Sequence, residues 1–119
     1  MVQFIENGSS ETQFELGQMF HKEINVQDYE EAVKWYTQAA KQGYRRAQHR
    51  LGGMYARGLG VAVNYTKAYA WCKVAASQQS RRAVLMLKKI EQKMSQQQIE
   101  EGRKLSQKYY LMYVEPFAS

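Results

Sequence analysis

The chain has 119 residues, enough for one domain of ordinary size, and 45% of them are hydrophobic, so it can bury a core. A single proline and the lack of glycine- or serine-rich runs argue against disorder, and the lone cysteine, Cys72, excludes an intramolecular disulfide. The formal net charge of +6 favours acidic partners: a carboxylate-rich peptide, nucleic acid or anionic lipid.

Hydrophobic periodicity predicts a chain made of helices, without strands. In chain order we expect them at about residues 11–22, 28–42, 44–57, 64–78, 80–93 and 95–112. Residues typical of helix N-termini support four of these starts: Ser10 with Gln13, Asp28, Asn64, and Ser95 with Gln98. Gly43 marks the end of the second helix, where a left-handed residue is needed.

An internal repeat organises these helices into pairs. The series Tyr29, Ala32 and Trp35 recurs 36 positions later as Tyr65, Ala68 and Trp71, and other matches keep nearly the same register. These matches are Ala47 and Leu51 with Ala83 and Leu87, and Leu16 and Gly17 with Leu51 and Gly52. Such periodicity is typical of stacked helix-turn-helix units. We therefore predict an N-terminal extension at 1–10, repeats at about 11–43 and 44–79, a half repeat with a capping helix at 80–112, and a tail at 113–119.

Large and small residues alternate in a way that suits close helix packing. Gly17 and Gly52 would let one helix backbone approach the next, so that a bulky side chain on the partner helix fills the space. A lone unit cannot bury its apolar face, which makes the last helix a necessary cap. We expect its buried stripe to consist of Ile99, Leu105, Tyr109 and Met112.

The series of Leu-Gly, Met-aromatic, Gly-x-Gly, Lys-Ala, Trp and Ala-Ala resembles the Sel-one-like repeat, a relative of the tetratricopeptide repeat. The stretch from Leu87 to Tyr109 is similar to the cap that often closes bacterial members. The resemblance implies an all-α fold, an α-solenoid of two full repeats, a half repeat and a C-terminal capping helix. Members of the family are generally adaptors, so it also implies a non-catalytic protein that binds another protein through its concave face.

The first helix of each unit lines the concave groove in the related tetratricopeptide repeats. Aligning Leu16, Leu51 and Leu87 carries this groove onto the present chain. The predicted partner-binding residues are Phe14, Gln18, Arg46, His49, Arg50, Arg57, Arg82, Leu85 and Lys89. Arginine can grip a carboxylate through two hydrogen bonds, so we expect an extended acidic segment or a C-terminal carboxylate in the groove.

Two alternatives stand beside this interpretation of the groove. The charged residues could be ordinary solvated side chains on exposed helix faces. Phe14 could instead pack against Phe4 and Ile5 as an N-terminal cover. The sequence also contains a signal for nucleic acid or an anionic surface as the partner: basic pairs recur at Arg45 with Arg46 and at Arg81 with Arg82. Nucleic acid or an anionic surface could exploit them, although we expect a protein partner rather than nucleic acid.

The residues that catalysis or metal binding would need are missing from the pattern. His21 and His49 lie 28 positions apart and, with one cysteine, form no metal-ligand spacing. Cys72 occupies the repeat position of Tyr36, which favours a core role over a nucleophile. We therefore expect no enzyme, no metal and no cofactor.

The chain end and the cellular location complete the expectations. Residues 109–117 are unusually apolar, so they either fold back on the cap or dock into another molecule, giving a monomer or a weak homodimer. No apolar run approaches the roughly 20 residues that span a bilayer, and residues 1–10 do not form a secretory signal. We expect a cytoplasmic protein, or a periplasmic one if Met1 was added to a trimmed chain.

Overall fold

A computed structural model describes residues 9–21 and 26–117, and within these ranges the chain is helical, without strands. The helices are α2 (Ser10–His21), α3 (Val26–Lys41), α4 (Arg45–Arg57), α5 (Tyr65–Ser77), α6 (Arg81–Glu91), α7 (Gln96–Tyr113) and the short 3-10 helix η1 (Glu115–Phe117). Each helix predicted from the sequence is present. The all-α solenoid expected from the repeat is therefore confirmed.

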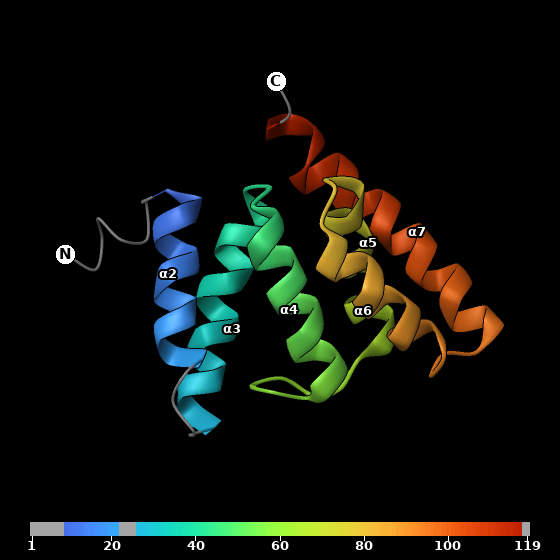
Figure 1. Cartoon of the computed structure of the whole chain (residues 1–119), viewed down its shortest axis with the longest axis horizontal. Coiled ribbons are helices and arrows are strands. Elements are labelled where there is room, and N and C mark those ends of the chain that lie inside the picture. Colours follow the sequence, from blue (N-terminus) through green and yellow to red (C-terminus); the bar gives the residue numbers. More distant parts are fainter. Residues whose placement is uncertain (1–8, 22–25, 118–119) are drawn as a thin grey trace.

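The helices pack in chain order, as the repeat predicts. α2 packs on α3, α3 on α4, and α4 on α5, so the stack runs across Figure 1 from α2 to α7. The last unit departs from this order because α6 and α7 both pack against α5. α7 thus covers the second helix of the second repeat, which is how the stack is capped at this end.

Two predicted helix starts are confirmed in detail. The Asn64 side chain accepts a hydrogen bond from the backbone N–H of Lys67 at 2.9 Å and caps α5. At α7, the Ser95 hydroxyl accepts from the backbone N–H of Gln98, and the Gln98 side chain accepts from the backbone N–H of Ser95. Such reciprocal bonds satisfy amides that have no partner within the helix.

Two other predicted starts are wrong by one or two residues. Ser9, not Ser10, accepts from the backbone N–H of Thr12, at 3.2 Å, ahead of α2. α3 already begins at Val26, so Asp28 lies in its first turn instead of capping it. Both errors have a physical reason, since acidic side chains are stabilised anywhere in a first helical turn and adjacent serines give the same sequence signal.

The joints after α3 and α5 have the same backbone geometry. Gly43 and Gln79 occupy equivalent positions, and both have left-handed φ angles, 84° and 69°. The amide of each donates to a carbonyl three residues earlier, at Ala40 and Ala76, with N···O distances of 3.1 and 2.9 Å. The turn from α3 to α4 and the turn from α5 to α6 therefore have similar geometry, although the second turn has Gln79 in place of glycine.

The core lies between the helix layers and consists mainly of large apolar residues and alanines. Tyr36, Leu51, Met54 and Trp71 are almost fully buried within it. Cys72 is also fully buried, and this burial raises the pKa of its thiol to about 12. The prediction of a core role for Cys72 is thus confirmed, since a protonated and buried thiol is a poor nucleophile.

The chain end folds back in part. Tyr109 and Tyr113 pack against the indole of Trp71, with ring centroids 4.4 and 5.6 Å away, and Val114 is buried. Met112 is 47% exposed, so its predicted place in the buried stripe is wrong; Tyr113, one full helical turn after Tyr109, takes that place. The other face of this segment leaves large apolar side chains exposed: Tyr110, Leu111, Met112 and Phe117.

Candidate interaction groove

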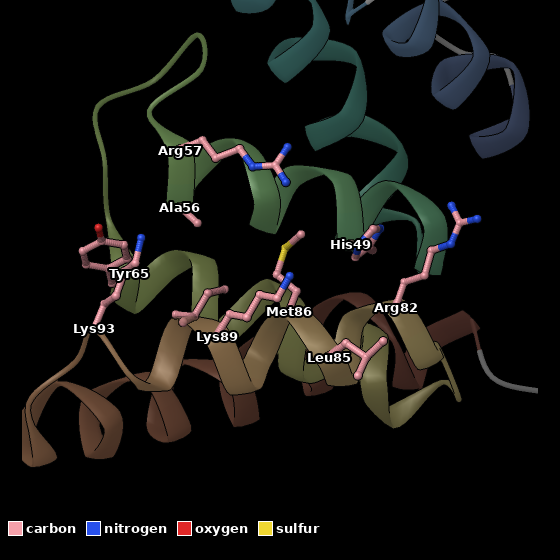
Figure 2. A pocket seen from close by; sticks show the side chains of 10 residues that line it. His49, Ala56, Arg57, Tyr65, Arg82, Leu85, Met86, Lys89 and Lys93 are labelled. Carbon is pink, nitrogen blue, oxygen red and sulfur yellow. The ribbon is translucent and has the colours of Figure 1, made fainter.

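A hollow of about 310 Å³ lies between α4 and α6, the first helices of successive units. Figure 2 shows Met86 rising from α6 toward α4, with Arg57 on α4 across from it. We call this space the apolar hollow, since half of its lining is apolar. Its residues are His49, Ala56, Arg57, Tyr65, Arg82, Leu85, Met86, Lys89, Ile90 and Lys93.

A second hollow, of about 300 Å³, lies at the beginnings of the same two helices. We call it the arginine hollow, because five of its eight residues are arginines. It is lined by Arg45, Arg46, His49, Arg50, Gln79, Ser80, Arg81 and Arg82. His49 and Arg82 line both hollows, so the two form one continuous surface, which we call the groove.

A smaller space extends the groove toward the first repeat. It measures about 50 Å³ and brings His21 of α2 to the same surface as His49, Arg50 and Arg57 of α4. The His21 ring is held in place by its Nδ1 atom, 3.1 Å from the hydroxyl of Tyr36. Residues from three first helices thus meet along one side of the stack.

The arginine side chains are positioned by groups that do not neutralise them. The Nη1 atom of Arg45 donates to the carbonyl oxygen of Gln78 at 2.9 Å, and the Arg46 guanidinium lies 4.7 Å from the centre of the Phe14 ring. Within the described ranges, the only ion pair is on α7, between Arg103 and Glu100. The guanidinium groups of the groove therefore have no carboxylate partner among the described residues.

The crowding of positive charge shows in the two histidines. Burial lowers the pKa of His49 below its usual value, and the neighbouring charges of Arg50, Arg82 and Arg57 lower it further. The pKa of His21 is lowered by burial and then by Arg50 and Arg57. Both rings therefore favour the neutral form, because burial disfavours the imidazolium and the neighbouring guanidinium groups add to that effect.

Seven of the nine partner-binding residues predicted from the sequence line these hollows. They are Arg46, His49, Arg50, Arg57, Arg82, Leu85 and Lys89. Phe14 requires a correction: it is only 1% exposed, between the rings of Tyr36 and Tyr44, and it cannot present its ring to a partner. Its alternative contacts, Phe4 and Ile5, lie outside the described residues. Gln18 is half-buried on α2 and lines none of the three hollows.

The groove also contains residues that the prediction did not select. Tyr65, Met86 and Lys93 line the apolar hollow, and Arg45 and Arg81 line the arginine hollow. Arg45 and Arg81 recur at the same repeat position in the sequence, where their pairing with Arg46 and Arg82 suggests nucleic-acid binding rather than a place in this groove. Tyr65 had no such signal, since it begins a second helix rather than a first one.

Metal-ligand clusters and membrane-spanning helices are both absent from the described part of the chain. No group of three or more histidine, cysteine, aspartate or glutamate side chains lies close enough together there to hold a metal ion. None of the described helices combines the length and the apolar character that crossing a bilayer requires.

Comparisons with known proteins agree with the repeat architecture. The family model for the Sel1 repeat matches residues 10–44 and 45–80. Among solved structures, the chain is similar to a protective antigen present in uropathogenic Escherichia coli strains that displays an SLR fold, with 30% sequence identity and a TM-score of 0.85. The match covers 93% of this chain and 24% of that one, so the chain spans about a quarter of the antigen's length. A search of the curated proteins finds no match.

Proposed function

Because the chain belongs to the Sel1 repeat family, we propose that it is a non-catalytic adaptor that binds an extended acidic segment of a partner protein in the groove. Folds of this family generally mediate protein–protein interactions. The partner segment occupies the surface between α4 and α6, and neither protein is changed chemically.

The observation that carries this proposal is the unbalanced charge of the groove. Eight lysine and arginine side chains line its two larger hollows, and no aspartate or glutamate does. Gathering like charges without counter-ions destabilises the free protein, and a partner of opposite charge relieves that repulsion. Arginine also forms bidentate hydrogen bonds with carboxylates, which adds geometric selectivity to the charge attraction.

The apolar hollow supports a protein partner over a simple polyanion. Leu85 is 62% exposed, and it lies beside Met86 and Ile90 in a surface that a leucine- or phenylalanine-like side chain could fill. Interfaces usually gain most of their affinity from such apolar or aromatic anchors, surrounded by polar contacts. An acidic segment with one apolar side chain suits both hollows together.

Affinity capture from native lysate, followed by mass spectrometry, tests the proposal. We expect the wild type to retain a discrete protein that the variant Arg46→Glu/Arg50→Glu loses. The matched control is Lys104→Glu/Lys108→Glu, which makes the same charge change at exposed positions of α7, and it should still retain the protein. Circular dichroism of all three proteins confirms that they are folded.

Two outcomes would contradict the proposal. Retention of the same protein by the groove variant would place the interaction elsewhere on the molecule. Recovery of nucleic acid alone, released by nuclease and by modest salt, would favour the second candidate function. That candidate rests on the paired arginines at the starts of α4 and α6, and phosphate-backbone binding weakens steeply as salt rises.

A further inference from the structure

The arginine hollow carries more positive charge than one carboxylate can neutralise. Arg45 and Arg46 begin α4, Arg81 and Arg82 begin α6, and Arg50 lies one turn further along α4. These five guanidinium groups surround a space of about 300 Å³ with no described carboxylate among its lining residues. Its complement is a compact ligand with more than one negative charge and several acceptor oxygens.

The backbone around this hollow also favours an anion. α4 and α6 both begin here, so the partial positive charges of two helix N-termini add to those of the arginines. The N-cap of α4, Tyr44, provides no side-chain acceptor for the amides of the first turn, whereas Ser80 caps α6 by accepting from the backbone N–H of Ala83. The first-turn amides of α4 are thus left for solvent or a ligand.

We propose that the arginine hollow recognises a phosphorylated side chain of the partner segment, while an apolar side chain a few residues away enters the apolar hollow. The proposal rests on the proposed function, and it names the chemistry of the segment that the groove binds. A phosphorylated side chain carries about −1.5 to −2 charges at neutral pH and three strong acceptor oxygens. A carboxylate offers one charge and two oxygens, and so leaves most of the five arginines without a partner.

The shared lining of the hollows defines how the two side chains are arranged. Arg82 and His49 belong to both spaces, so the phosphate and the apolar anchor sit side by side along the groove. Free phosphate fills one hollow only, and a nucleic-acid strand has phosphates but no aliphatic side chain for the space beside Leu85 and Met86. A phosphopeptide satisfies both spaces at once.

Fluorescence anisotropy with synthetic peptides tests this proposal on the full chain. The probes share one sequence, in which the central residue is serine, glutamate or phosphoserine and a leucine follows two positions later. We expect the phosphoserine peptide to bind about tenfold more tightly than the serine peptide, with the glutamate peptide between them. Replacing the leucine by glycine should weaken binding of the phosphoserine peptide.

The variant Arg81→Gln/Arg82→Gln removes two charges from the hollow but keeps unbranched, polar side chains at both positions. Both residues are exposed, and no hydrogen bond or ion pair within the described ranges involves their side chains, so the fold should persist. We expect it to reduce the preference for phosphoserine to less than about threefold. The matched control, Lys104→Gln/Lys108→Gln on α7, should keep the full preference.

Three results would overturn the inference, and they separate it from the proposed function. If phosphoserine binds no more tightly than glutamate, and both need Arg46 and Arg50, the partner is acidic but not phosphorylated. If no peptide binds, the phosphate site and the acidic groove both fail. If a single-stranded oligonucleotide of equal charge binds more tightly than the phosphopeptide and displaces it, the hollow is a nucleic-acid site.

Discussion

Three glycines face a side chain of a neighbouring helix at distances that no other residue would allow. A Cβ atom added at Gly17, Gly52 or Gly102 would lie 2.5–2.7 Å from Tyr36, Cys72 or Tyr69, respectively. Each pair joins two helices: α2 with α3, α4 with α5, and α7 with α5. The close spacing of these three helix pairs therefore depends on the lack of a Cβ atom at each glycine.

Gly52→Ala should lower the free energy of unfolding by about 1–3 kcal/mol, because the new methyl group overlaps the Cys72 sulfur and approaches the Ala68 carbonyl. Urea denaturation measures the change. Gly53→Ala is the matched control on the same helix, since its Cβ would meet only the Met86 side chain at 3.4 Å. Adding Cys72→Ala to Gly52→Ala should restore part of the loss; equal effects at Gly52 and Gly53 would refute this account.

Gln79 has the backbone conformation that glycine has at the equivalent joint, Gly43. A left-handed conformation costs a residue with a Cβ atom about 1–2 kcal/mol, so Gln79→Gly should raise the free energy of unfolding by about 1 kcal/mol. Thermal unfolding followed by circular dichroism measures the gain. Gln78→Gly should have the opposite effect, because the Gln78 side chain donates to the Gly43 carbonyl and to Gln48. A loss of stability in both variants would contradict the prediction.

At the scale of the element, α7 holds the stack closed through a small aromatic cluster. Tyr109 and Tyr113 lie against Trp71, whose own helix, α5, also contacts α4 and α6. Gly102 lets α7 approach Tyr69 on the same helix. The cap therefore stabilises the whole second repeat through one helix.

Tyr109→Ala should lower the free energy of unfolding by about 2–3 kcal/mol, because it removes a half-buried ring whose centroid lies 4.4 Å from that of Trp71. Tyr110→Ala removes a neighbouring ring that is 40% exposed, and it should change the value by no more than about 0.5 kcal/mol. Tryptophan fluorescence during chemical denaturation follows both variants. Similar losses at the two positions would show that the cluster does not hold the cap.

The helices could be predicted from the sequence because their signals are local: periodic apolar residues, Asn64 and Ser95 as caps, and Gly43 as a stop. Two of the errors fall where neighbouring residues carry the same signal. Ser9 and Ser10 compete to cap α2, and the packing of α7 against α5 decides that Tyr113, not Met112, turns inward. That choice depends on tertiary packing, which a periodic pattern does not contain.

At the scale of the whole molecule, the repeat register selects residues of α4 and α6 that line the two larger hollows. The prediction that Phe14 faces a partner is wrong, because an alignment of repeats indicates the direction of a side chain but not which neighbouring side chains bury it. Tyr36 and Tyr44 enclose that ring, and Arg46 lies over it. The two basic pairs were visible in the sequence, but their convergence into one hollow depends on how α4 and α6 are brought together in space.

The histidines of the groove make the stability of the molecule depend on pH. His21 and His49 have folded-state pKa values below the ordinary 6.5, so the unfolded chain binds more protons once the pH falls below that value. We expect their contribution to stability to be complete above about pH 7, to decrease as the pH falls through 6.5, and to level off below the folded-state pKa values. Urea midpoints between pH 8 and pH 5 measure the decrease.

The variant His21→Gln/His49→Gln serves as the comparison for this pH dependence. Glutamine does not titrate, so the variant should lose less stability than the wild type as the pH falls from 7 to 5. Carboxylates titrate mainly below this window and are the same in both proteins, so the difference isolates the imidazoles. Parallel curves for the two proteins would show that neither ring is held neutral by the fold.

His49 and Arg82 border both hollows, so what fills one hollow alters the surroundings of the other. An anion beside Arg82 would offset part of the field that keeps His49 neutral, and it would also fix two side chains that the second occupant must meet. The two subsites are therefore linked by a coupling free energy, and each occupant changes the affinity for the other by the same factor. Affinities of fragments measured one hollow at a time will not add up to that of a ligand that spans both.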